Sequence, residues 1–214
     1  MSTRRLSPLD RVFEQLDQAV RTVMGPPPPA TRPNPAEGIP DAPLTDRERR
    51  HAAALMRVNH AGEIMAQGLY QGQALTARLD EVRGAMEQAA IEEFDHLAWC
   101  EQRLAELRDR PSVLGPIWYT GAFLLGAGAG LAGDRWSLGF VSETEAQVIS
   151  HLEEHLGRLP PGDQRSRAII GQMKIDEAHH GEEARKAGGL PLPTPARNFM
   201  AAVSKVMTRT AYWL

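Results

Sequence analysis

Cysteine is almost absent from this chain, which has Cys100 alone among its 214 residues. One thiol excludes an intramolecular disulfide and a thiolate cage for a metal, and it favours a reducing compartment. An excess of charge of one sign is also missing, because the net charge is −3. Without a broad basic excess to neutralise phosphates, we expect no nucleic-acid partner.

Strand-like alternation of apolar and polar residues is missing throughout the chain, and we therefore expect an all-α protein. Helical periodicity instead marks four stretches, at residues 45–77, 79–108, about 137–158 and 163–187. Short loops separate the first stretch from the second and the third from the fourth. Such loops predict two antiparallel hairpins that pair into a four-helix bundle.

The N-terminal part of the chain differs in composition from the rest. Residues 1–24 lack the apolar run of a secretory signal and have the spacing of a short amphipathic helix. Residues 25–44 are rich in proline, which excludes a helix and predicts an extended, exposed linker. We place the main domain at residues 45–214, where Thr45 and Glu48 form a capping-box pattern.

Two apolar segments lie outside the four helical stretches. Residues 111–133 carry no charge, but six glycines make them only weakly apolar, so we expect a crossover between the hairpins rather than a membrane span. Residues 196–213 predict a final amphipathic helix. Its apolar face would hold Phe199, Met200, Val203, Val206 and Met207.

Acidic side chains interrupt the apolar stripe of each predicted bundle helix near its middle. Each stripe contains one glutamate, and in the second and fourth helices a histidine follows one turn later on the same face. The six residues are Glu63, Glu93, His96, Glu145, Glu177 and His180. Because burying lone carboxylates is costly, the pattern predicts a cation among them.

The spacing of these residues indicates which cation to expect. One glutamate from each of two helices, with Glu-x-x-His from each of the other two, is the ligand set of di-iron and di-manganese carboxylate proteins. Carboxylate and imidazole ligands with open positions suit iron(II) and dioxygen. We therefore expect two iron ions per chain, with dioxygen as co-substrate.

Neighbouring acids and histidines leave the register of each helix open. They lie off the apolar stripes, so we favour the six residues above. The pair Asp176 and His179 could take the place of Glu177 and His180. Likewise, Glu143 could replace Glu145, and Glu92 could replace Glu93. Asp176, with its shorter side chain, is better suited to accept a hydrogen bond from a ligand imidazole.

Several other side chains have competing interpretations. Tyr70 and Cys100 lie near the stripes, and packing in the core explains them better than a catalytic role. His151 flanks the third helix, where proton transfer or substrate contact is as plausible as a packing role. Glu48 and His51 repeat the Glu-x-x-His spacing without an apolar stripe, which indicates an exposed capping turn.

Short motifs surround the six residues. They are LMRVNHAGE at 55–63, QGLYQGQ at 67–73, EEFDHL at 92–97, SETEAQV at 142–148 and IDEAHH at 175–180. With these motifs the chain, over about residues 45–214, closely resembles the demethoxyubiquinone hydroxylase family of ferritin-like di-iron carboxylate proteins. The first motif is long and distinctive, whereas the others are short but correctly spaced.

The resemblance implies a ferritin-like bundle and a specific reaction. The six residues match the family's iron ligands, with Glu93 and Glu177 as the bridges between two irons. The implied reaction is hydroxylation of the ring of 2-polyprenyl-3-methyl-6-methoxy-1,4-benzoquinol (3-demethoxyubiquinol) by dioxygen in ubiquinone synthesis. No Gly-x-Gly-x-x-Gly fingerprint follows a strand, so we expect no tightly bound flavin or nicotinamide.

The substrate implied by the resemblance has a polyprenyl tail that resides in the bilayer. We therefore expect a peripheral protein at the cytoplasmic face of the cell membrane, with residues 111–133 and 196–213 at the interface. Arg197, Lys205 and Arg209 would face the lipid headgroups. Other ubiquinone-synthesis proteins are candidate partners.

Two other classes of protein could share parts of this pattern. A ferritin- or rubrerythrin-like protein that oxidises iron or destroys peroxide would use the same ligands, although rubrerythrins usually add a four-cysteine iron site that one cysteine excludes. A lipid-binding scaffold without metal would leave the buried carboxylates uncompensated.

Overall fold

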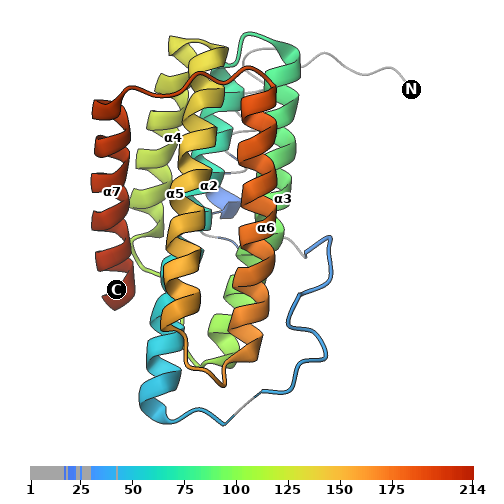
Figure 1. The fold of residues 1–214 in the computed structure, drawn as a ribbon, viewed down its shortest axis with the longest axis vertical. Coiled ribbons are helices and arrows are strands. Elements are labelled where there is room, and N and C mark those ends of the chain that lie inside the picture. Colours follow the sequence, from blue (N-terminus) through green and yellow to red (C-terminus); the bar gives the residue numbers. More distant parts are fainter. Residues whose placement is uncertain (1–16, 18, 23–24, 26–29, 42) are drawn as a thin grey trace.

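The computed structural model describes residues 17, 19–22, 25, 30–41 and 43–214, and no strand occurs among them (Figure 1). The main helices are α2 (Asp46–Thr76), α3 (Asp80–Glu106), α4 (Gly115–Ala132), α5 (Asp134–Arg158), α6 (Gln164–Lys186) and α7 (Thr194–Trp213). The predicted helix within residues 1–24 lies largely outside the described residues and stays a prediction.

Two antiparallel hairpins, α2 with α3 and α5 with α6, form the bundle, and α3 also contacts α6 while α2 contacts α5. Helix α2 begins at the predicted capping box, in which the Thr45 hydroxyl accepts from the Glu48 backbone and the Glu48 carboxylate accepts from the Thr45 backbone. The expectation of an all-α, ferritin-like four-helix bundle is therefore confirmed.

The crossover between the hairpins is itself mostly helical, as α4, and packs along α2. Glycine makes this close packing possible, because a Cβ at Gly126 would collide with the carbonyl oxygen of Leu69, and one at Gly72 with that of Phe123. None of the helices in the described part of the chain combines the length and the hydrophobicity that a membrane-spanning helix needs.

Helix α7 lies beside α4 and α5 (Figure 1) and also packs on α2. Its predicted apolar face is divided between the protein and the solvent. Met207 is buried, as is Ala211 one turn further along the helix, whereas Phe199 and Val206 are each 55% exposed. The helix therefore docks with one edge of this face and leaves the other edge uncovered.

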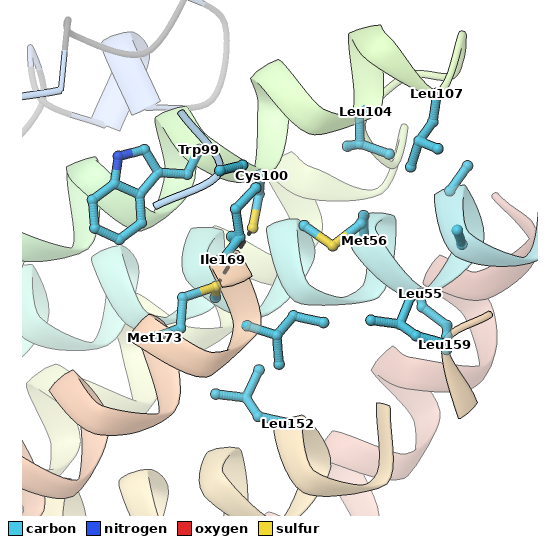
Figure 2. Close-up of a cluster of buried hydrophobic side chains, with 14 residues drawn as sticks. Leu55, Met56, Trp99, Cys100, Leu104, Leu107, Leu152, Leu159, Ile169 and Met173 are labelled. Atoms are coloured by element: carbon cyan, nitrogen blue, oxygen red, sulfur yellow. Dashed lines mark hydrogen bonds between the residues drawn. The ribbon is translucent and has the colours of Figure 1, made fainter. Parts of the chain in front are cut away.

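Two apolar clusters fill the bundle, one toward each end. Figure 2 shows the first, whose side chains come from α2, α3, α5 and α6 and include Met56, Cys100, Leu152 and Met173. The second cluster includes Tyr70, Met86, Val141 and Ala184. The predicted metal-binding residues lie between these clusters along each helix, so they form a polar layer within an apolar core.

The N-terminal segment, defined here as residues 30–41, departs from the expected exposed linker. It runs along α3 and α6, on the side of the bundle away from α7 (Figure 1). Ala36 is fully buried in the first apolar cluster. Arg165 and Arg103 hold the far end of the segment through the Ile39 carbonyl oxygen and the Asp41 carboxylate. Proline excludes a helix here, but ion pairs and one buried side chain fix the segment.

Candidate metal centre

All six residues predicted to bind metal are buried at the centre of the bundle. Glu63 comes from α2, Glu93 and His96 from α3, Glu145 from α5, and Glu177 and His180 from α6, and none of them is more than 6% exposed. Each helix thus contributes one inward carboxylate at mid-length. The structure brings the six together as the helical periodicity predicts.

The Nδ1 atom of His96 points into a group of carboxylates. It lies 2.9 Å from Glu93 Oε2, 3.2 Å from Glu177 Oε1 and 3.6 Å from Glu63 Oε2. One ring nitrogen can form one good hydrogen bond, so three close carboxylates exceed what this atom can satisfy. A cation shared by the same four side chains would satisfy them together.

His180 repeats this arrangement on the other side of the same two carboxylates. Its Nδ1 lies 3.3 Å from Glu93 Oε1 and 3.3 Å from Glu177 Oε2. Glu93 and Glu177 therefore each direct one oxygen toward His96 and the other toward His180. This division of oxygens is the one a bridging carboxylate needs between two cations.

Carboxylates also hold the outer nitrogens of both imidazoles. His96 Nε2 lies 2.9 Å from Asp176 Oδ2, and His180 Nε2 lies 2.8 Å from Glu92 Oε2. With the proton on Nε2, each Nδ1 presents its lone pair to the cluster. Metal-binding histidines are commonly oriented in this way.

The electrostatics of the centre demand positive charge. Burial raises the pKa of Glu63 and of Glu145 well above the usual carboxyl range, and repulsion from Glu93 and Glu177 adds to the rise. Burial alone would lower the pKa of His96, but the charge of Glu93 and the hydrogen bonds to Asp176, Glu177 and Glu63 together raise that pKa well above its ordinary value. Protons or metal ions must therefore accompany the buried carboxylates.

The donor atoms fit a metal ion. One ligand atom each from Glu63, Glu93, His96 and Glu177 can be chosen so that all lie within 4.8 Å of one another. Glu93 Oε1 is buried without a hydrogen-bond donor among the described residues, although His180 Nδ1 is nearby. Carboxylate and imidazole donors suit a divalent transition metal. The residues present are thus appropriate for the predicted ions.

Glu145 has a partner that sequence reasoning missed. The Tyr70 hydroxyl, from α2, donates a hydrogen bond to Glu145 Oε1. The sequence favours a packing role for Tyr70, and Tyr70 does belong to the second apolar cluster. Tyr70 lies seven residues after Glu63 on the same helix face, and this spacing indicates that its side chain points into the bundle. The packing of α2 on α5 is needed to identify Glu145 as its hydrogen-bond partner.

The alternative residues lie around the centre rather than in it. Asp176 accepts a hydrogen bond from His96, as expected, and Glu92 pairs with His180. The His179 side chain is 66% exposed and pairs with Glu183 on its own helix. Glu143 forms an ion pair with Arg197 of α7.

The structure places His151 and Cys100 away from the imidazole–carboxylate contacts. His151 Nε2 lies 2.9 Å from Ser204 Oγ of α7, and no contact within the described residues links it to the six. The Cys100 thiol is buried against the Met173 sulfur, 3.8 Å away, in the first apolar cluster.

Two cavities adjoin α7, and they differ in their relation to the centre. The larger, about 910 Å³, is a groove along α5 and α7 with a mixed polar and apolar lining that includes His151 and none of the six residues. The smaller, about 100 Å³, lies among α2, α4, α5 and α7 and is mostly apolar. Gly62 and Thr144 line it, one residue before Glu63 and Glu145 respectively. We call it the apolar pocket.

Comparisons with known proteins agree with this geometry. The family model described as "Ubiquinone biosynthesis protein COQ7" matches residues 50–211. A 3-demethoxyubiquinol 3-hydroxylase of Nitrosococcus oceani is 58% identical over 214 residues, which cover 100% of both chains. The enzyme of the same name from Xanthomonas euvesicatoria pv. vesicatoria is 57% identical, and the match covers 99% of this chain and 97% of the relative. The one from Pseudomonas fluorescens is 54% identical, and the match covers 99% of each chain. The chain therefore belongs to the COQ7 family of ubiquinone biosynthesis proteins.

Proposed function

We propose that this chain is a 3-demethoxyubiquinol 3-hydroxylase that works through two iron ions. It would hydroxylate the ring of 2-polyprenyl-3-methyl-6-methoxy-1,4-benzoquinol with dioxygen. The observation that carries the proposal is the convergence of two imidazole Nδ1 atoms on the same two carboxylates, Glu93 and Glu177. Enzymes of that name at 54–58% identity over nearly the whole chain support the reaction.

The ligand roles follow from which side chains share contacts. Glu63 and His96, whose nearest oxygen and nitrogen lie 3.6 Å apart, would hold one iron. Glu145, on which the charge of His180 acts, would hold the other together with His180. Glu93 and Glu177 would bridge the two, because each faces both imidazoles. Iron held by these residues would supply the activation of dioxygen. One oxygen atom would enter the ring C–H bond and the other would leave as water, with two electrons and two protons from a reductant.

The chain's own residues prepare this chemistry. Asp176 and Glu92 keep both imidazoles oriented, and Tyr70 orients Glu145. The apolar clusters on either side exclude water from the polar layer. The substrate ring would enter from the apolar pocket, since its walls include residues adjacent in sequence to Glu63 and Glu145.

A membrane surface would deliver the long-tailed substrate. Exposed apolar side chains occur on α4 and α7, the two outer helices that border the apolar pocket, and they include Ile117, Leu124, Leu131, Phe199, Val206 and Trp213. Lys205 and Arg209 of α7 form no ion pair within the described residues, whereas Arg197 pairs with Glu143. We propose peripheral binding to the cytoplasmic face of the cell membrane through α4 and α7.

The proposal can be tested with purified, iron-loaded protein. Supplied with the quinol substrate, a reductant and labelled dioxygen, it should release hydroxylated quinol carrying one labelled oxygen, detected by mass spectrometry. Glu93→Ala protein should hold less iron and form no product. Rapid oxidation of iron(II) or consumption of peroxide without hydroxylated quinol would instead support a ferritin- or rubrerythrin-like function.

A further inference from the structure

Arg32, in the N-terminal segment, reaches the metal centre from outside the four-helix bundle. Its Nη1 donates to Asp176 Oδ2 at 2.9 Å. The same oxygen lies 2.9 Å from His96 Nε2. One carboxylate oxygen therefore connects the guanidinium of Arg32 directly to a predicted metal-binding imidazole.

Other contacts hold the guanidinium in a defined orientation. Arg32 Nε donates to Asp95 Oδ2 at 2.8 Å, and the Asp95 side chain is only 2% exposed. The Thr31 backbone also donates to Asp95, at 2.6 Å. The guanidinium lies over the Trp99 ring, 4.9 Å from its centroid. These contacts anchor Arg32 to α3 while its Nη1 reaches Asp176 on α6.

The contact with Arg32 constrains how Asp176 and His96 are arranged. A guanidinium can only donate hydrogen bonds, so the Asp176 oxygen that faces it must accept. Gln172 donates to the second oxygen of Asp176 at 2.9 Å. With both oxygens accepting, His96 Nε2 has to donate to Asp176, so Nδ1 is the ring nitrogen available to bind a cation among the carboxylates.

The other imidazole lacks an equivalent clamp among the described residues. His180 Nε2 pairs with Glu92, whose side chain is 37% exposed, against 14% for Asp176. Gln88, on the same helix, donates to Glu92, and no arginine in the described part of the chain forms a hydrogen bond or ion pair with Glu92. The charge of Arg32 acts on Glu92 through space, but its hydrogen bonds to side chains around the centre are confined to the half that contains His96.

We propose that Arg32 is a positioning residue that holds Asp176, and through it His96, in the orientation that binds metal. This inference rests on the proposed metal centre. It assigns a role to the N-terminal segment, which precedes the residues 50–211 matched by the family model. Loss of Arg32 should weaken one metal site and leave the other intact.

Cobalt titration of the metal-free, full-length chain tests this proposal. The absorption bands of bound Co²⁺ report each site, and the melting temperature of the metal-free protein reports folding. Wild-type protein should bind two Co²⁺ ions. In Arg32→Gln one ion should bind as in the wild type and the other about 10–100-fold more weakly, as for other losses of support around a metal ligand.

Two further variants separate positioning from general stability. Asn34→Ala removes the hydrogen bond from the same segment to Gln102, which has no contact with the centre, and it should retain two normal sites. Asp176→Asn interrupts the link from the α6 side and should reproduce the Arg32→Gln pattern. Two normal sites in folded Arg32→Gln, or equal weakening in Asn34→Ala, would overturn the proposal. Wild-type protein that binds no Co²⁺ would instead refute the metal centre itself.

Discussion

Tyr70 of α2 and Glu145 of α5 are joined by a buried hydrogen bond in which the phenol donates to the carboxylate. Glu145 belongs to the proposed metal centre, whereas Tyr70 belongs to the adjoining apolar cluster. The bond therefore links the position of one proposed ligand to the packing of the core. It also provides the only side-chain donor to Glu145 among the described residues.

Tyr70→Phe should impair the Glu145 half of the centre. Phenylalanine keeps the packing but leaves a buried carboxylate without its donor, which costs about 1–3 kcal/mol when no metal is bound. We expect a lower melting temperature for the metal-free protein and about 10–100-fold slower turnover. Tyr119→Phe is the matched control, because Tyr119 donates to Gln71, outside the centre. Equal loss of turnover in both variants would contradict a specific role for Tyr70.

The register of α5 and α6 can be tested with adjacent pairs of residues. Alanine at His180 should remove or displace at least one iron, whereas alanine at exposed His179 should leave two irons bound. Likewise, Glu145→Ala should lose iron and Glu143→Ala should not, because Glu143 pairs with Arg197 at the surface of α5. The number of irons per chain, measured on folded protein, distinguishes the ligands from their neighbours. If His179 or Glu143 proved necessary for iron binding, the choice of ligands on that helix would be wrong.

Gly62→Leu should separate substrate access from metal binding. A Cβ at Gly62 meets nothing within 4 Å, and the residue lines the apolar pocket of about 100 Å³. Leucine would fill the pocket and favour the helix by up to about 1 kcal/mol relative to glycine. We expect an unchanged or higher melting temperature and two irons, but a raised KM for the quinol.

Gly84→Leu provides the control for this prediction. Gly84 is an exposed position of α3, also with open space for a Cβ, and it does not line the apolar pocket. It should share the gain in helix stability without the change in KM. An unchanged KM in Gly62→Leu would indicate that the quinol reaches the centre by another route.

Membrane binding through α7 can be tested with polar replacements on its uncovered edge. Phe199→Ser, Val206→Ser and Trp213→Ser combined should weaken binding to anionic liposomes, because all three side chains are more than half exposed. Turnover of long-tailed quinols should fall more than turnover of short-tailed analogues. Leu79→Ser, at the exposed start of α3, is the control. Equal losses for long and short tails would contradict a role in membrane delivery.

Helical periodicity was enough to predict the four helices of the bundle and the six inward residues. A period of 3.6 residues forces side chains three and four apart onto one face, so a stripe of apolar residues places any acid within it in the core. His96 and Glu93, or His180 and Glu177, could be assigned for this local reason. The position of Asp176 off the stripe and its short side chain also predicted that it would accept a hydrogen bond from a ligand imidazole, but not that the imidazole would be His96 of α3.

Contacts between segments that are distant in sequence could be identified only in the folded chain. Tyr70 reaches Glu145, and Arg32 reaches Asp176, across 75 and 144 residues of sequence. The N-terminal segment has no periodicity, so composition predicted an exposed linker where ion pairs and the buried side chain of Ala36 hold it to α3 and α6. Glycines that weakened the apolar character of residues 111–133 instead allow α4 to approach α2. Such contacts depend on the shapes of two surfaces that meet. The spacing of residues within one segment describes only the surface of that segment.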